Sequence, residues 1–322
     1  MNAHKLTVTI AVPTLNEEQH LPDCLASVAS QTYREIVEVL VVDGRSGDRT
    51  REIAASHPGV RVLDNPRRIQ AAALNIALAE AKGDVFVRVD GHCTLESDYV
   101  ERCIEALAAT GAAMVGGGMT PVSSSVTQAG IASAMTSKVG AGPARFHVGG
   151  EAGWVDTVYL GAMVTDVARE VGGYSESVGV NEDSELAFRM QSRGGVWFDP
   201  TVRSRYAPRA SLVSLGRQFY RYGKSRAATV RKHPDSLRPR QLASPLLVIG
   251  LVSPWRRPIL AAYSTVVLFD SVRVARRAGS TAVVHAACLP IMHLTWGVGF
   301  LVGLVRVQRS VALPAVCLSA ED

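Results

Sequence analysis

An aspartate and a histidine follow directly after a mostly apolar segment of the chain. Residues 85–89 have the pattern of a buried strand, and Asp90 and His92 come after it with one glycine between them. Both side chains can turn toward one rim, where a carboxylate and an imidazole can hold a divalent ion with positions open for a diphosphate. Such a metal acts as a Lewis acid that neutralises a leaving phosphate. The alternative is a polar turn with a partly buried histidine.

Polar residues also follow two earlier strand-like segments. Pro13, Asn16 and Glu17 come after the first, and Asp43 opens the turn 43–47 after the second. Each group on its own fits a helix cap or an ordinary turn. In an open parallel sheet, however, ligands bind beyond the carboxyl ends of the strands. Three acidic strand ends in one sheet would therefore meet in a single cleft.

Another acidic pair, Glu182 and Asp183, stands before a helical pattern. The spacing predicts a helix that begins near residue 181 and ends at Gly194 and Gly195, with Glu185 and Arg189 placed for an i,i+4 ion pair. Carboxylates at a helix N-terminus are favoured by the helix dipole, which is one explanation of the pair. The functional explanation is that one of the two is a general base facing the cleft.

These candidates need a scaffold that gathers strand ends. Short β-branched runs alternate with longer helical patterns, which is typical of βαβ units and a mainly parallel sheet covered on both faces. The predicted strands are 6–12, 36–42, 60–63 and 84–89, and the predicted helices are 17–31, 49–56, 69–81 and 98–109.

Composition limits the possible classes of protein. The chain has 322 residues, 47% of them hydrophobic, which is enough for one large α/β domain and an appendage. The five cysteines are scattered and odd in number, which favours reduced thiols in a cytoplasmic setting, and the N-terminus shows no secretory signal. The formal charge of +5, with arginines more frequent after Arg203 and beside apolar segments, indicates an anionic membrane surface at least as much as nucleic acid. Membrane lipid is the expected partner, and nucleic acid is not.

The C-terminal third has a membrane-like pattern. Residues 209–232 mix apolar, aromatic and basic side chains as an interfacial helix does, and the alternative is an amphipathic helix packed on the catalytic domain. The apolar segments 242–252 and 258–269 are each too short to span a bilayer and indicate a tilted or re-entrant hairpin. Residues 281–305 lack Asp, Glu, Lys and Arg and are long enough to span.

Basic residues give this part of the chain an orientation. The runs near Arg231 and at 273–279 are expected on the cytoplasmic side of the inner membrane, with the catalytic domain. Four parts are expected in total: a catalytic domain at 1–208, a basic interface region at 209–240, membrane segments at 241–310 and a tail at 311–322.

Five segments, in this order and at these intervals, resemble family 2 glycosyltransferases of GT-A fold. They are VPTLNEE, VVDGRSGDRT, RRIQAAALNIALAEAKGD, VRVDGH and NEDSELAFRM. The stretches VDTVYLGA, VGGYSESVG and RQFYRYGKSRAATVRKHP, followed by apolar segments, are similar to the succinoglycan-biosynthesis ExoA-like branch. The resemblance implies a Rossmann-like α/β catalytic domain followed by membrane helices.

The resemblance also implies roles at the donor site. Pro13, Thr14 and Glu17 lie where the family contacts the nucleoside, and Asp43 lies where it meets the uracil edge. Asp90 occupies the first position of the family's D-x-D motif, which approaches ribose and metal.

Metal, base and acceptor roles follow in the same way. His92 occupies the metal-ligating last position of D-x-D, and Asp183 matches the catalytic base of the E-D motif, with Glu182 beside it. The segment Gln218 to Tyr222 resembles a shortened Q-x-x-R-W motif. Arg68 and Arg221 are candidate diphosphate partners, and the alternative for each is a solvated surface arginine.

Two positions depart from the family pattern. His92 stands where D-x-D has its second aspartate, and imidazole suits Mn²⁺ well. Tyr222 stands where the processive motif has tryptophan, so processivity does not follow from that motif.

The function expected from these residues is sugar transfer. The resemblance implies an inverting, metal-dependent glycosyltransferase that uses Mn²⁺ or Mg²⁺ to move a sugar from a nucleoside-diphosphate sugar, expected to be a UDP-sugar, to a lipid-linked or cell-surface saccharide. One base without an evident nucleophile fits a single displacement. The alternatives are a polyprenyl-phosphate acceptor and a non-catalytic nucleotide-binding membrane protein, and intact Asp43, Asp90 and Asp183 argue against the second.

Overall fold

The computed structural model describes residues 5–305 of the chain, so the expected tail at 311–322 lies outside the described residues. A nine-stranded sheet forms the centre of the N-terminal part, and its strands run in the order β3-β2-β1-β4-β8-β6-β9-β5, with β7 paired to β9. The strands are β1 Val8–Thr14, β2 Ile36–Asp43, β3 Val60–Asp64, β4 Val85–Arg88, β5 Cys93–Leu95, β6 Met114–Pro121, β7 Gly153–Trp154, β8 Tyr159–Val164 and β9 Val196–Tyr206.

The sheet is parallel in its first half and mixed in its second. Strands β3, β2, β1 and β4 pair in parallel, as the alternating pattern predicted. Beyond β4 the expectation of a mainly parallel sheet does not hold, because β8 pairs antiparallel with both β4 and β6, and β9 pairs parallel with β6 but antiparallel with β5. The α/β sheet therefore brings the carboxyl ends of β1, β2 and β4 to one edge.

Helices cover both faces of this sheet, which explains why β1 and β4 are buried along their whole length. One apolar cluster contains side chains of α1, α2 and α4, and the other contains side chains of α3, α8 and α9. The helices of this part are α1 Leu21–Ala29, α2 Thr50–Ser56, α3 Gln70–Glu80, α4 Tyr99–Thr110, α5 Val126–Met135, α6 Lys138–Ala141, α7 Arg145–Val148, α8 Thr165–Glu170 and α9 Glu182–Met190, the last continued by the short helix Gln191–Arg193.

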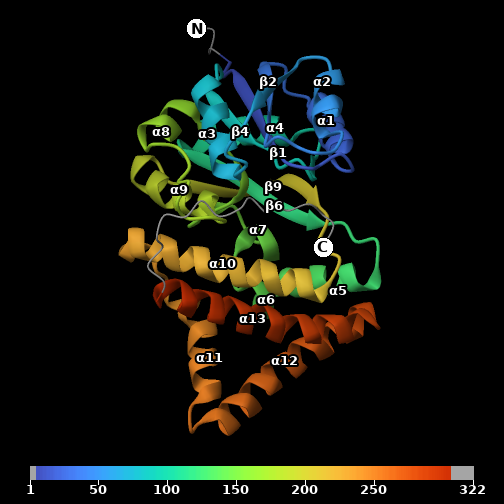
Figure 1. The fold of residues 1–322 in the computed structure, drawn as a ribbon, viewed down its shortest axis with the longest axis vertical. Helices are drawn as coiled ribbons and strands as arrows, with labels where there is room; N and C mark the ends of the chain where they lie inside the picture. Colours follow the sequence, from blue (N-terminus) through green and yellow to red (C-terminus); the bar gives the residue numbers. More distant parts are fainter. Residues whose placement is uncertain (1–4, 306–322) are drawn as a thin grey trace.

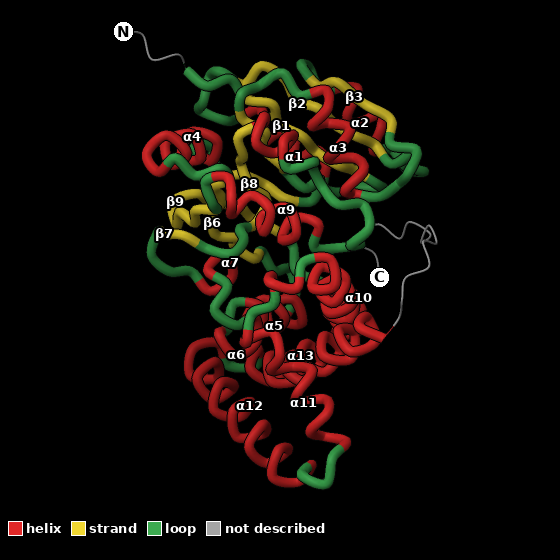
Figure 2. The backbone as a smooth tube through the Cα atoms, turned by 90° about the vertical axis from the view of Figure 1, so that its left-hand side faces the viewer, coloured by secondary structure: helices red, strands yellow, loops and turns green. Residues whose placement is uncertain are grey.

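The four helices α10 to α13 form a second layer beneath the sheet, as Figure 1 shows. They are α10 Leu212–Lys232, α11 Ala243–Val252, α12 Arg256–Ala278 and α13 Thr281–Val305, with short 3-10 turns at Pro234–Ser236 and Pro239–Leu242. Helix α10 lies between the sheet and α13, and α11 and α12 form a hairpin that projects away from both (Figures 1 and 2). Helix α10 packs along α13 and is bonded to the catalytic domain at Asn181 and Glu185, and its contact with a membrane surface stays a prediction.

The length of α12 differs from the expectation. Residues 258–269 were predicted to be too short to span a bilayer, but the helix runs for 23 residues and is, like α13, long and apolar enough to cross a membrane. It continues past Phe269 because Asp270, the first charged residue after Arg257, is satisfied inside the protein: Ser137 donates to its Oδ2 at 2.5 Å, and His285 Nε2 lies 3.1 Å from the same oxygen.

Candidate active site

A pocket opens at the carboxyl ends of β1, β2 and β4. Six residues that the sequence singled out line it together: Pro13, Thr14, Glu17, Arg68, Asp90 and His92. The remaining lining residues are Leu15, Gly44, Asn65, Ile69, Gln70, Ala73 and Gly91. The rule that strand ends gather at one edge of the sheet therefore placed the pocket correctly.

Asp43 lies beneath this pocket and has no exposed surface. Its Oδ1 accepts a 2.5 Å hydrogen bond from the Ser46 hydroxyl, and its Oδ2 accepts one from the Ser46 amide at 3.1 Å. The Thr14 hydroxyl also lies 3.5 Å from Oδ1. In this conformation Asp43 orders the turn whose next residue, Gly44, lines the pocket.

Asp90 is held from two sides. Arg88 Nε donates to its Oδ1 at 2.8 Å, and Gln70 Nε2 donates to the same oxygen at 2.9 Å. Oδ2 has a longer bond, 3.3 Å, from Arg88 Nη2. Burial by itself would raise the pKa of Asp90, but the charge and hydrogen bonds of Arg88 bring that pKa below its usual value. Asp90 is therefore a fixed carboxylate with Oδ2 as its less engaged oxygen.

His92 is oriented by Glu17. Its Nδ1 lies 3.2 Å from Glu17 Oε1, and although burial disfavours the imidazolium, this carboxylate raises the pKa of the ring. A carboxylate on one ring nitrogen is the usual outer partner of a metal-binding histidine, because it leaves the other nitrogen to the metal. Ligand atoms of Asp90, His92 and Cys93 lie within 4.8 Å of one another.

Cys93 is the member of this group that the sequence did not single out. Its thiol lies 2.7 Å from the Tyr159 hydroxyl, and burial raises its pKa well above the usual value. Since metals bind the thiolate rather than the thiol, Asp90 and His92 are the better ligands. A carboxylate and an imidazole fit Mn²⁺ or Mg²⁺, and the donor set is therefore compatible with such an ion.

Arg88 connects the pocket to the acidic pair on α9. The side chain is 6% exposed, and its Nη1 donates to Glu182 Oε1 at 3.0 Å. Burial raises the pKa of Glu182, Arg88 lowers it, and neighbouring Asp183 raises it again, to about 7 in all. Asp183 itself is partly exposed, and its Oδ1 accepts a hydrogen bond from the backbone amide of the next residue, Ser184. Of the two carboxylates, Asp183 is thus the one that can meet a substrate.

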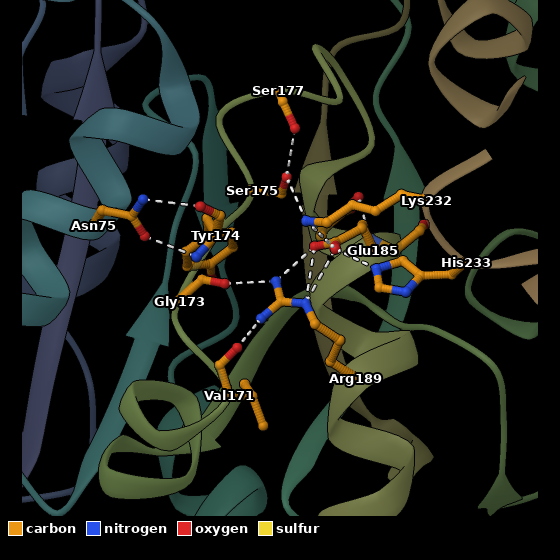
Figure 3. A network of polar contacts seen from close by, with 12 residues as sticks. Asn75, Val171, Gly173, Tyr174, Ser175, Ser177, Glu185, Arg189, Lys232 and His233 are labelled. Atoms are coloured by element: carbon orange, nitrogen blue, oxygen red, sulfur yellow. Dashed lines mark hydrogen bonds and ion pairs between the residues drawn. The ribbon is translucent and has the colours of Figure 1, made fainter. Parts of the chain in front are cut away.

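A buried carboxylate one turn further along anchors α9. Glu185 has a fully buried side chain that accepts bonds from Arg189 on its own helix and from Lys232 and His233 at the end of α10, as Figure 3 shows. Arg189 also donates to the backbone oxygens of Val171 and Gly173. The predicted Glu185–Arg189 pair is therefore part of a larger network that ties α9 to the end of α10.

The remaining candidates lie on α10. Gln218 Nε2 donates to the Tyr222 hydroxyl at 2.8 Å, and the Tyr222 backbone oxygen accepts a bond from Asn181, the residue just before α9. Tyr222, in the position of the family tryptophan, thus connects this helix to the acidic pair. Gln218 and Arg221 are not among the residues that line the pocket of Asp90 and His92.

Besides Cys93, two residues that hold Asp90 were missed in the sequence. Arg88 was read as part of an apolar strand, although a single arginine in the run VFVRVD was a signal for a buried ion pair. Gln70, the first residue of α3, carried no local signal, because only the fold brings it to Asp90.

Comparison with known proteins fits this geometry. A family model described as "Glycosyl transferase family 2" matches residues 9–171. The "Succinoglycan biosynthesis protein ExoA" of Rhizobium meliloti is 34% identical over 97% of this chain and 100% of its own length. A dolichyl-phosphate-sugar glucuronosyltransferase of Methanococcus voltae is 27% identical over 70% of this chain and 74% of its own.

Solved structures support the same fold. The mannosyltransferase PcManGT of Pyrobaculum calidifontis, solved in complex with GDP-Man and Mn²⁺, gives a TM-score of 0.61 at 22% identity and covers 93% of this chain and 88% of its own. TarS 1-349 of S. aureus, solved with UDP, gives 0.52 at 14% identity, with 92% of each chain covered. The chain belongs to the ExoA-like branch of glycosyltransferase family 2, and its catalytic domain has a GT-A-like fold.

Proposed function

We propose that this glycosyltransferase is membrane-attached, metal-dependent and inverting, and that it moves a sugar from a UDP-sugar to a lipid-linked or cell-surface saccharide. The observation that carries the proposal is the Arg88 bridge, because one guanidinium contacts both the D-x-H carboxylate Asp90 and Glu182 beside the base. The donor pocket and the proton acceptor are thereby held next to each other.

At the donor, Asp90 Oδ2 and His92 would hold the divalent ion. When bound, the ion supplies positive charge to the departing diphosphate. The family relative solved with GDP-Man and Mn²⁺ supports this choice of metal. Arg68, which lines the same pocket, would contribute a further cation to the diphosphate.

At the nucleoside, Pro13, Thr14 and Glu17 would form the wall of the site. Asp43 would meet the uracil edge only after the turn that covers it opens, since its oxygens are bound to Ser46 in this conformation. The solved relative with UDP supports a uridine donor.

The transfer itself needs one displacement. The acceptor oxygen attacks the anomeric carbon, the bond from that carbon to the diphosphate oxygen breaks, and Asp183 takes the hydroxyl proton. Because a single attack from the far side inverts the anomeric centre, no covalent sugar–enzyme intermediate is required. Gln218 and Arg221 on α10 would lie toward the acceptor.

Attachment would come from the C-terminal helices. Residues 1–208 would form the catalytic domain, 209–240 the interface region and 241–310 the membrane segments. The basic residues Arg273, Arg276 and Arg277 at the end of α12 support a cytoplasmic orientation at the inner membrane.

The acceptor has a second candidate class. The Methanococcus voltae relative has a name that describes a dolichyl-linked sugar phosphate, which favours a polyprenyl-linked acceptor as the alternative. A non-catalytic nucleotide-binding role is the third possibility, and it predicts no turnover.

The test is a donor panel. Detergent-purified protein is incubated with UDP- and GDP-sugars and Mn²⁺ or Mg²⁺, with saccharide and polyprenyl-phosphate acceptors in separate arms, and release of nucleoside diphosphate is measured. We expect UDP release that depends on metal and acceptor, and a 10²- to 10⁴-fold lower rate in Asp183→Asn with donor binding retained. Turnover of Asp183→Asn at the wild-type rate would contradict the role of Asp183, and binding without any turnover would favour the non-catalytic alternative.

A further inference from the structure

The helices after the catalytic domain differ in what surrounds them. Helices α11 and α12 form a hairpin whose apolar side chains are largely exposed; residues 243–272 are called the apolar hairpin below. Its exposed members are Leu246, Ile249, Val252, Trp255, Leu260, Val266, Leu268, Phe269 and Val272. Arginines flank its base, at 238 and 240 before α11 and at 273, 276 and 277 on the last turns of α12, and two more, Arg256 and Arg257, are exposed at the far end of the hairpin, where α12 begins. This is the pattern of a segment inserted among lipids, with cations at the headgroups.

Helix α13 has different surroundings. Its first half packs on α5 and α6, where a Cβ at Gly130 would collide with Val284 and where Ser133 lies 3.0 Å from His285. Its second half packs along α10, and there a Cβ at Gly223 would collide with the Trp296 backbone. Helix α13 is therefore packed along its length against α5, α6 and α10, and the hairpin helices α11 and α12 also pack on it (Figures 1 and 2).

Helix α10 is too highly charged to lie in the hydrocarbon interior of a bilayer. It carries six basic residues, namely Arg217, Arg221, Lys224, Arg226, Arg231 and Lys232. Its other side is bonded to the catalytic domain, since Asn181 donates to the Tyr222 backbone and Lys232 donates to Glu185. A helix with this many charges and these partners stays at the water side of the membrane.

These contacts exclude a simple crossing by α13. The glycine contacts show that α10 and α13 run side by side in the same direction, from Gly216 beside Ile291 to Ala227 beside Gly303. If α13 crossed the bilayer, the charged middle of α10 would have to enter the hydrocarbon with it.

We propose that α13 lies along the membrane surface instead of crossing it, and that the apolar hairpin is the part that enters the bilayer. The proposal rests on the membrane attachment given under the proposed function and specifies its geometry. Helix α13 forms the floor between the inserted hairpin and α10, and both ends of α13 are on the same side of the membrane as the catalytic domain. The base Asp183 is thereby held at a fixed height above the lipid surface, through the contact of α9 with α10.

The test is the sidedness of single cysteines. In a Cys317→Ser background, reporters are placed at exposed positions on either end of α13, Ser280→Cys and Val305→Cys. Ser56→Cys on α2 reports the catalytic domain, and Leu268→Cys reports the apolar hairpin. A membrane-impermeant maleimide is added to sealed right-side-out and inside-out vesicles from the expression host, with detergent-opened vesicles as the control for reactivity.

We expect the reporters at 280 and 305 to label in the same vesicle orientation as the reporter at 56. The reporter at 268 should stay unlabelled in both orientations until detergent is added. Labelling of 280 and 305 from opposite sides would overturn the placement of α13, and labelling of 268 in sealed vesicles at the rate of 56 would overturn insertion of the hairpin. Release of the protein by carbonate washing would instead contradict the membrane attachment itself. Failure of the attachment is therefore distinguishable from failure of the placement of α13.

Discussion

The guanidinium of Arg88 lies between the carboxylates of Asp90 and Glu182, with Nε 2.8 Å from Asp90 and Nη1 3.0 Å from Glu182. All three side chains are almost completely buried. One positive charge therefore compensates two carboxylates that come from a strand end and from a helix start 92 residues apart in the sequence. Loss of that charge would leave both carboxylates buried without a cation.

Arg88→Gln should therefore be strongly destabilising. Removal of one partner of a buried ion pair typically costs about 3–5 kcal/mol, whereas Arg205→Gln, which breaks the largely exposed pair with Glu96, should cost about 1 kcal/mol or less. Thermal unfolding of the two purified variants in the same detergent measures the difference. Equal unfolding temperatures would show that Arg88 is not the buried cation of the site.

His92→Ala should weaken metal binding, with Cys93→Ser as its matched control. Both residues belong to the same cluster, but the Cys93 thiol is protonated and bonded to Tyr159. We expect the Mn²⁺ concentration for half-maximal turnover to rise about 10- to 100-fold in His92→Ala, with partial recovery at high Mn²⁺, and to stay unchanged in Cys93→Ser. Release of UDP measured over a range of Mn²⁺ concentrations gives these values, and calorimetric titration of UDP at several Mn²⁺ concentrations tests whether nucleotide binding changes with them. If Cys93→Ser weakens Mn²⁺ as much as His92→Ala does, the thiol is a ligand and the assignment is wrong.

The pKa of Glu182, raised to about 7, predicts a pH dependence of turnover. Below that pH the residue holds a proton, and above it the added negative charge makes neighbouring Asp183 a stronger base. Turnover should therefore rise through pH 7 in the wild type, and this rise should disappear in Glu182→Gln while turnover itself persists. Asp183→Asn should be slow at every pH. A rise near pH 7 that survives in Glu182→Gln would assign it to a different group.

Local sequence patterns were sufficient to predict much of the site. Strand 85–89 and the polar residues after it predicted the pocket edge, because strand ends in a parallel sheet must meet there. The helix beginning near residue 181 was also predicted correctly, since its acidic start and apolar spacing are local features.

The contacts that organise the site were not predictable in this way. Arg88 pairs with Glu182 across 94 positions, and Glu185 pairs with Lys232 across 47, so only the assembled fold brings them together. The length of α12 was underestimated for the same reason. From the sequence, Asp270 marks the end of an apolar run; only the fold shows that Ser137, just before α6, and His285 on α13 satisfy it.

The buried, ion-paired Glu185 should make the stability of the fold sensitive to acid. Burial would raise its pKa, but the bonds from Arg189, Lys232 and His233 bring it from 4.5 in the unfolded chain to about 2 in the folded protein. A lowered folded-state pKa stabilises the fold above pH 4.5, and this contribution is lost as the pH falls toward 2. The free energy of unfolding should therefore fall less steeply between pH 4.5 and 2 in Glu185→Gln than in the wild type or in the exposed-pair control Glu80→Gln. Identical slopes in all three proteins would contradict the role of the network.

Gly223 lies where α10 and α13 pack at backbone distance, so a side chain at this position should weaken their packing. A Cβ at this position would collide with the backbone oxygen of Trp296 on α13, and backbone cannot move aside as a flexible side chain can. Alanine has the better helix propensity, by about 1 kcal/mol, so an isolated α10 would be stabilised by Gly223→Ala. In the folded protein the collision should outweigh that gain, because overpacking costs about 1–3 kcal/mol or more.

Gly118→Ala, where a Cβ would meet nothing within 4 Å, is the control and should change stability by about 0.5 kcal/mol or less. Thermal unfolding in detergent compares the two variants, and a Gly223→Ala protein as stable as Gly118→Ala would show that α10 and α13 do not meet at backbone distance.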